Sequence, residues 1–367
     1  FADAFWTAFG LALGTYINWL IVSKRLRRYS IRANNSITLP EFFSNRFREN
    51  KKTIMMISSL FILIFFTVYA ASCFVTCGKL FSTLFGAPYI VMMILGAVFV
   101  LVYTILGGFL AESASDFMQA IVMIVALSVV VVLCIVHAGG ITDVMDNARA
   151  IPGFVEFFGI ASPTVDEDGV QLVEAGMPLF GEAGAYGVIT VCSTLAWGLG
   201  YFGMPQVLLR FMAIRKEDEL KRSRRIAMVW VVLSLGIAVF IGLIGRQLFP
   251  TEHLTAASAE NIFITLSTSY LPPIIAGFVM AGILAATISS SDSYLLIAAS
   301  SLSKNIYQGI LKKDATDKQV MTASRITLLV LTVIGVLIAL DKDSVIFQIV
   351  SFAWAGFGAT FGPLVLF

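Results

Sequence analysis

Nine long apolar stretches constrain this chain more than any other feature of its sequence. A membrane-spanning helix needs about 20 mostly apolar residues, and its backbone satisfies its own hydrogen bonds inside the bilayer. Of the 367 residues, 58% are hydrophobic and 13% are charged, whereas soluble domains carry about 25% charged residues. The sequence therefore predicts an all-α polytopic membrane protein. The candidate spans are Ala4–Val22, Ile54–Leu84, Tyr89–Leu106, Phe117–His137, Tyr186–Met212, Ala227–Phe249, Pro272–Ser303, Met321–Leu340 and Ile346–Phe367.

The basic residues predict an orientation. All but four of the 25 Lys and Arg residues fall in the loops 24–52, 210–225 and 304–325. With nine spans these loops lie on one side, which the positive-inside rule makes cytoplasmic. We expect a multi-pass protein of the plasma (inner) membrane, with the acidic loop 139–185 outside as a solvated lid. The net charge of +2 gives no indication of nucleic-acid binding.

The segment Ser36–Arg48 predicts a short cytoplasmic helix at the membrane surface. Thr38 is a suitable N-cap, and a proline follows in the first turn. We expect Phe42, Phe43 and Phe47 to lie on the membrane.

The fifth span carries a cluster of helix-breaking residues. Its sequence TLAWGLGYFGMPQVLLRF places three glycines and Pro205 within eight residues. Proline removes a backbone donor, and broken helices form midplane sites in many transporters. Trp197 and Tyr201 are four residues apart, so we expect them to share one face at the break. The alternative is a kinked helix with packed aromatic side chains.

The seventh span combines small residues with a polar cluster. Small side chains let helix backbones approach closely, so they predict close helix packing. The small residues of this span are Gly277, Ala281, Gly282, Ala285 and Ala286. Ser289, Asp292 and Ser293 then share one helical face. An intramembrane acid is a functional candidate by default, and these oxygens suit a hard cation. Serines alone are weak evidence, because helix serines often bond to their own backbone.

The sequence contains three further groups of candidate functional residues. Asp116 either reaches an ion site or caps a helix. Cys73 and Cys77 are a metal pair or, as we favour, small buried residues. The histidines, His137 and His253, have no nucleophile motif or metal-ligand spacing around them. We therefore expect a protein that is not an enzyme.

The order of several motifs resembles the sodium/solute symporter family. They include GTYINWLIVSKRLRRYS, ITLPEFFSNRF, GGFLAESASDFMQA, WGLGYFGMPQVLLRFMA, AGILAATISSS and AWAGFGATFGP. The resemblance covers nearly the whole chain and is strongest to proline-transporting members. It implies an inverted-repeat transporter fold of five plus five helices, with residues 1–367 forming a single transmembrane domain. On this reading the chain covers core helices 2 to 10 of a longer protein, and helix 1 is absent.

The resemblance also implies site residues. A sodium ion is expected at the Ala286 carbonyl and the Ser289 and Ser290 hydroxyls. Some members hold a further sodium with an acid matching Asp116 and hydroxyls matching Ser289, Ser290 and Ser293. They have a serine where this chain has Asp292, which either strengthens that site or replaces it with a local charge partner. The substrate residues match Trp197, Tyr201, Pro205 and Tyr69.

The implied function is sodium-coupled import of L-proline by alternating access across the lipid bilayer, with Na⁺ as coupling ion. One alternative keeps the fold and changes the small organic solute to pantothenate, a sugar or sialic acid. Another is a transporter-like sensor with a signalling domain beyond Phe367. The sequence gives no oligomeric state.

Overall fold

The computed structural model describes residues 1–342 and 344–367 and is mostly helical. The elements in chain order are α1 (Ala2–Ile17), the π-helix η1 (Asn18–Val22), α2 (Ser23–Arg32), α3 (Leu39–Arg46), α4 (Thr53–Phe85), α5 (Tyr89–Gly107), α6 (Phe109–His137), α7 (Ile141–Arg149), β1 (Gly159–Ile160), β2 (Val173–Glu174), β3 (Met177–Pro178), β4 (Gly184–Ala185), α8 (Val188–Leu195), the 3₁₀ helix η2 (Ala196–Phe202), α9 (Pro205–Ala213), α10 (Glu219–Leu248), α11 (Ala256–Ala259), α12 (Ile262–Tyr270), α13 (Pro273–Ser300), the π-helix η3 (Ser301–Leu311), α14 (Asp317–Ile338) and α15 (Ile346–Leu366).

The helices long and apolar enough to cross a membrane agree with the nine predicted spans. Within the described residues there are eight such helices, and a ninth span if the bent pair Val188–Phe202 and Pro205–Ala213 counts as one. The expectation of a polytopic helical protein is confirmed.

The chain divides into two compact units. Unit 1 comprises Phe1–Leu13, Gln119–Gly198 and Met228–Ala286. Unit 2 comprises Gly14–Met118, Leu199–Ala227 and Thr287–Phe367.

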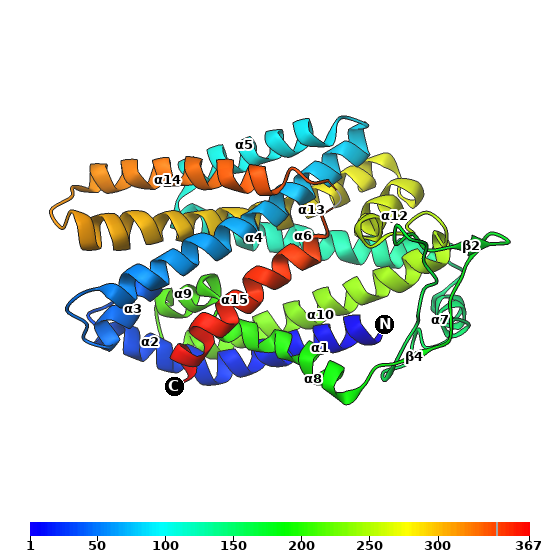
Figure 1. Cartoon of the computed structure of the whole chain (residues 1–367), viewed down its shortest axis with the longest axis horizontal. Helices are drawn as coiled ribbons and strands as arrows, with labels where there is room; N and C mark the ends of the chain where they lie inside the picture. Colours follow the sequence, from blue (N-terminus) through cyan, green and yellow to red (C-terminus); the bar gives the residue numbers. More distant parts are fainter. Residues whose placement is uncertain (343) are drawn as a thin grey trace. The chain divides into compact units, whose positions relative to one another are not determined.

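Unit 2 is organised around α4, the blue helix that lies beside α5 and α14 in Figure 1. Small residues set these helices close together. A Cβ on Gly78 would lie 2.5 Å from the Tyr89 ring, and one on Gly96 would lie 2.5 Å from Cys77 Cβ. Cys77 therefore fills the space opposite a glycine, which supports its interpretation as a packing residue.

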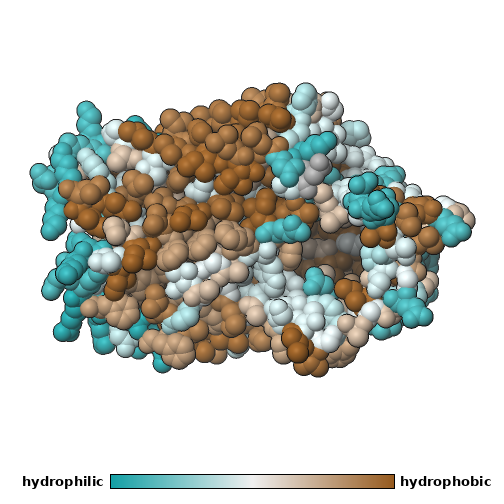
Figure 2. Space-filling model, in the orientation of Figure 1, coloured by the Kyte–Doolittle hydropathy of each residue, from teal (hydrophilic) through white to brown (hydrophobic). Residues whose placement is uncertain are grey.

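The outer surface of unit 2 is apolar along its spans. Large hydrophobic side chains of α14, such as Leu329, Val333 and Leu337, are exposed in the isolated chain. Figure 2 shows hydrophobic residues over α14 and hydrophilic ones at the end where the chain turns from η3 into α14. This distribution suits helices that face lipid and a turn that faces water.

Unit 1 contains part of the small-residue stripe of α13. A Cβ on Gly282 would lie 2.6 Å from Ala126 Cβ on α6, so this glycine permits close helix contact as predicted. A Cβ on Gly277 would meet no atom within 4 Å. Within the described part of unit 1, Gly277 therefore makes no close helix contact of the kind that Gly282 makes.

The same unit holds the loop 139–185, which contains α7 and two small antiparallel sheets. One sheet pairs β1 with β4, and the other pairs β2 with β3.

The helix α3 begins as predicted but faces a different environment. Thr38 Oγ1 accepts a backbone N–H of the first turn at 3.3 Å. Phe42 and Phe43 are 2% and 0% exposed, and Phe43 stacks on Phe361 with ring centroids 5.7 Å apart. Of the three phenylalanines only Phe47 is exposed. The prediction of a membrane-facing surface was wrong for Phe42 and Phe43, because these rings pack into the core of unit 2.

Candidate functional site

The fifth span is broken where the sequence predicted it. α8 ends at Leu195, the 3₁₀ segment η2 follows, and α9 begins at Pro205 after a bend of 42°. Pro205 occupies the first turn of α9, where a missing N–H costs no hydrogen bond. Residues three apart eclipse in a 3₁₀ helix, so the spacing of Trp197 and Tyr201 does not place them on one face. That part of the prediction was wrong because it assumed α-helical geometry.

Glycines at the break allow α15 to approach closely. A Cβ on Gly203 would lie 2.1 Å from the Phe357 carbonyl oxygen, and one on Gly200 would lie 1.9 Å from Trp354 Nε1. The Tyr201 ring meets the Trp354 ring edge-on, with centroids 4.9 Å apart. These glycines therefore make room for a neighbouring helix as well as ending α8.

A buried amide supports the broken backbone. Asn18, which is fully buried at the start of η1, donates from Nδ2 to the Tyr201 carbonyl oxygen at 2.9 Å. Broken helices in a membrane need such partners for their freed carbonyls. The sequence interpretation missed Asn18, although a lone asparagine in an apolar span was a usable signal.

The predicted substrate residue Tyr69 lies on α4 within an aromatic group. Its ring stacks on Tyr294 of α13 with centroids 4.2 Å apart, and Tyr294 stacks in turn on Phe66 at 5.2 Å. Tyr69, Tyr201 and Pro205 all belong to unit 2, whereas Trp197 belongs to unit 1.

The predicted sodium ligands follow one another along α13. Ala286 is the last residue of unit 1, and Ser289 and Ser290 lie one turn later in unit 2. Both serines are half-buried. The adjacent Ser291 donates to the Thr287 carbonyl at 2.7 Å, as a serine with a purely local role does.

A group that we call the buried acidic cluster joins α6, α9 and α13. It consists of Glu112, Asp116 and Asp292 with the guanidinium of Arg210. Arg210 Nη2 lies 2.5 Å from Asp116 Oδ2, 3.2 Å from Glu112 Oε1 and 3.5 Å from Ser293 Oγ. Ser293 also donates its hydroxyl to Glu112 Oε1. Asp116 lies within α6 and forms an ion pair, so the helix-cap alternative is wrong.

Each carboxylate of this cluster keeps one oxygen without a partner. Asp292 is 2% exposed, and its Oδ1 accepts the backbone N–H of Ser293 at 2.7 Å. Among the residues that the structure describes, none is a hydrogen-bond partner of the buried oxygens Glu112 Oε2, Asp116 Oδ1 and Asp292 Oδ2. A buried hydrogen-bond acceptor without a partner destabilises the folded protein unless a cation or a hydrogen-bond donor contacts it.

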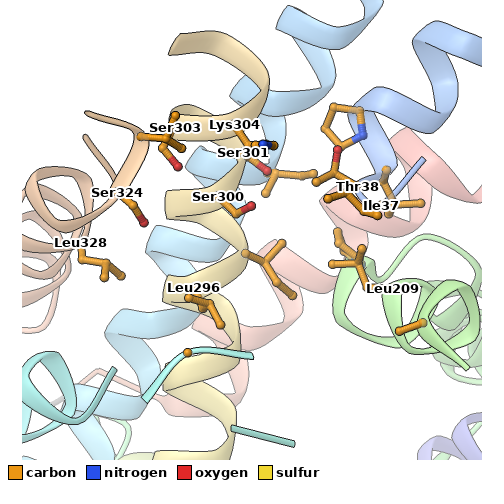
Figure 3. Close-up of a pocket in the computed structure, with 18 of the residues that line it drawn as sticks. Ile37, Thr38, Leu209, Leu296, Ser300, Ser301, Ser303, Lys304, Ser324 and Leu328 are labelled. Carbon is orange, nitrogen blue, oxygen red and sulfur yellow. The ribbon is translucent and has the colours of Figure 1, made fainter. Parts of the chain in front are cut away.

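Two adjoining cavities lie beside this cluster in unit 2. The larger measures about 1020 Å³ and is lined by the 35–40 segment, α9, α13, η3 and α14. Figure 3 shows Leu296 and Ser300 between Leu209 on one side and Ser324 and Leu328 on the other. The smaller measures about 10 Å³, is lined by Glu112 and Asp292, and shares Thr104, Gly107, Gly108 and Leu296 with the larger.

Some residues of the basic loops have specific partners. The Glu217 carboxylate forms ion pairs with Lys24 Nζ at 2.7 Å and with Arg28 Nε at 2.7 Å. We call these three residues the surface basic cluster. Arg28, through its hydrogen bond, and Lys24 hold the pKa of the Glu217 carboxyl below its usual value. Arg27 Nη1 donates to the Met212 carbonyl near the end of α9 at 2.5 Å.

Comparison with known proteins gives consistent matches. Residues 2–367 match the sodium:solute symporter family. The osmoregulated proline transporter of Bacillus subtilis is 38% identical over 98% of this chain and 68% of its own length. The high-affinity proline transporter of the same organism is 39% identical over 98% and 71%. A sodium/proline symporter of Haemophilus influenzae is 38% identical over 99% and 69%.

One solved structure has a similar fold. A Na⁺-coupled sialic acid symporter in a substrate-bound outward-open state superposes with a TM-score of 0.64, at 16% identity, over 92% of this chain and 73% of that one. At this identity the likeness concerns the fold alone.

Proposed function

The chain belongs to the sodium:solute symporter family, and from this premise we propose that its substrate is L-proline. It is an integral multi-pass membrane protein that couples solute movement to Na⁺, and it is not an enzyme. The observation that carries the proline proposal is the similarity to three bacterial proline transporters, at 38 to 39% identity over nearly the full chain.

We place the substrate at the broken span. The family resemblance assigns Trp197, Tyr201, Pro205 and Tyr69 to the substrate, and the aromatic rings among them suit a pyrrolidine ring. Unwound backbone amides and a nearby sodium ion suit the substrate carboxylate. The 42° bend before Pro205 supports this assignment, because it lies within the sequence motif WGLGYFGMP.

We assign the coupling sodium to the Ala286 carbonyl and the Ser289 and Ser290 hydroxyls. Their succession within one stretch of α13 supports this proposal. Bound sodium that raises the affinity of the protein for its substrate implies the reverse effect. Bound substrate then raises the affinity of the protein for sodium by the same factor. The membrane potential adds about 2.3 kcal/mol per charge per 100 mV to inward movement.

The finer architecture is also a proposal. We assign residues 1–367 to one transmembrane domain whose spans match core helices 2 to 10 of a five-plus-five inverted repeat. The bent fifth span and the similar fold of the sialic acid symporter support it. The basic residues support placing loops 24–52, 210–225 and 304–325 in the cytoplasm, with the protein in the inner membrane.

Uptake into liposomes tests the function. The full-length protein should take up labelled L-proline under an inward sodium gradient and should not do so under an inward potassium gradient. Excess unlabelled proline removes the signal, whereas pantothenate, glucose and sialic acid do not. Folded protein without proline uptake contradicts the substrate assignment.

Two variants test the site. Ser289→Ala should raise the sodium concentration for half-maximal uptake about tenfold, since it removes one ligand, and Ser291→Ala serves as a matched control because its hydroxyl bonds to its own helix. Trp197→Ala should raise the KM for proline more than it changes the sodium dependence. An unchanged KM removes Trp197 from the pocket.

A further inference from the structure

We propose that the large cavity of unit 2 binds an anionic phospholipid from the leaflet on the side of the basic loops. Lys304 on η3 and Arg325 on the neighbouring α14 bind its phosphate, and one acyl chain extends toward Leu296 of α13. This inference goes beyond the proposed function and depends on neither the sodium site nor the substrate.

Basic residues predominate among the charged groups that line this cavity. Of its described lining residues, Arg27, Lys304 and Arg325 are basic, and Asp317 is acidic. Arg27 donates to the Met212 carbonyl. Lys304 and Arg325 are exposed, and neither forms an ion pair with any residue that the structure describes. The lining therefore offers cations to an anionic ligand.

Large apolar side chains of the same lining are exposed in the isolated chain. Ile37, Leu106 and Met321 are 60%, 80% and 54% exposed. In a water-filled vestibule these side chains would stay in contact with water, whereas an acyl chain would cover them. Basic pockets between membrane helices on the cytoplasmic side bind lipid head groups. An apolar wall beside basic residues therefore suits an amphiphilic anion better than a soluble one.

The polar and apolar lining residues lie toward opposite ends of the cavity. In Figure 3, Ser301, Ser303 and Lys304 lie at one end, and Leu209 and Leu296 lie toward the other. Because α13 continues directly into η3, both kinds of residue follow one another along a single helix. A phospholipid is divided in the same way, so its head group matches the η3 end and its acyl chain matches the α13 end.

The size and position of the cavity agree with this ligand. Pockets for drug-sized ligands measure roughly 300–1,000 Å³, and this cavity measures about 1020 Å³. A ligand much larger than L-proline is therefore needed to fill it. Its lining includes a residue from each of the basic loops, namely Arg27, Met212 and Lys304. These loops place the cavity at the level of the lipid head groups.

The test is native mass spectrometry of the purified, delipidated full-length protein after incubation with phosphatidylglycerol or phosphatidylcholine. Wild type should retain one phosphatidylglycerol per protomer, and its affinity for phosphatidylcholine should be about tenfold lower. Lys304→Gln combined with Arg325→Gln should weaken phosphatidylglycerol binding about thirtyfold, since each basic residue near an anionic lipid contributes about fivefold.

Lys313→Gln combined with Lys318→Gln is the matched control. It removes the same charge from two exposed residues of the same η3–α14 region, and neither is among the described lining residues. Its phosphatidylglycerol binding should stay within about twofold of wild type, because this charge is screened by solvent. A control that loses as much binding as the cavity variant contradicts the proposed site.

A second arm tests the acyl chain. Leu296→Trp fills the apolar end of the cavity and should weaken phosphatidylglycerol binding in protein that thermal unfolding shows to be folded. Excess inorganic phosphate should leave the lipid bound to wild type. Displacement by phosphate alone means that the cavity holds a simple anion, and it overturns the lipid proposal.

The remaining outcomes separate this inference from the proposed function. Equal retention of the two lipids by wild type, which a water-filled vestibule predicts, overturns the proposal. A folded Lys304→Gln, Arg325→Gln protein that retains phosphatidylglycerol as wild type does also overturns it. Uptake of proline is measured in a different assay, so failure of either proposal leaves the other standing. The wild-type comparison decides even where a variant fails to fold.

Discussion

The buried acidic cluster and the surface basic cluster both pair carboxylates with basic side chains, but in opposite proportions. In the first, three carboxylates face one guanidinium, and Asp292 and Glu112 are 2% and 5% exposed. In the second, Glu217 faces Lys24 and Arg28 in water. Solvent screens the surface group, so its imbalance costs little. The buried group has no such screening, so its carboxylates depend on the single guanidinium beside them.

Arg210→Gln should have the largest effect, because it leaves Asp116 and Glu112 without their cation. Removing one partner of a buried pair costs about 3 kcal/mol or more, and the partial exposure of Arg210 places the effect at the lower end of that range. Thermal unfolding of the purified variant in detergent measures it. Adding Glu112→Gln should recover part of the loss, and a double variant no more stable than the single one contradicts the pairing.

Arg210→Lys should have an intermediate effect. The guanidinium contacts Glu112, Asp116 and Ser293 through Nη2, so one ammonium group reproduces its charge at that point without the planar fork. We expect a loss of about 1 kcal/mol in stability and retained uptake of proline. A loss as large as that of Arg210→Gln would mean that geometry matters here more than charge.

Glu217→Gln should change stability by less than the two Arg210 variants, because exposed ion pairs contribute little to stability. The effect should fall further at high salt, because exposed pairs are screened. Unfolding at low and high NaCl measures this. A large, salt-independent loss would make the surface basic cluster energetically equivalent to the buried one.

Acidification should give the smallest effect. The pKa of the Glu217 carboxyl is lowered in the folded protein, so its contribution is present above the ordinary glutamate pKa and is lost as the pH falls through the lowered value. The difference in stability between wild type and Glu217→Gln should therefore disappear in that acidic range. A difference that persists at lower pH contradicts the assignment of the ion pairs.

The sequence predicted the local features well. Thr38 caps α3, and the chain breaks before Pro205. Both follow from short-range rules for caps and for proline. The partners of Arg210 escaped prediction because they lie 94 and 98 residues away in the chain. The interpretation counted Arg210 as one more cytoplasmic charge and gave Glu112 no role.

The sequence by itself determined the number of spans, their order and the position of the break, because these depend on runs of apolar residues and on backbone chemistry. Only the tertiary structure decided which apolar face meets protein. Phe43 packs on Phe361 although it was expected to meet lipid, and Gly282 rather than Gly277 makes the close helix contact among the described residues of unit 1. The physical reason is that lipid and protein core are equally apolar, so hydrophobicity does not distinguish them. Which charges meet inside the protein was likewise decided by how its helices pack.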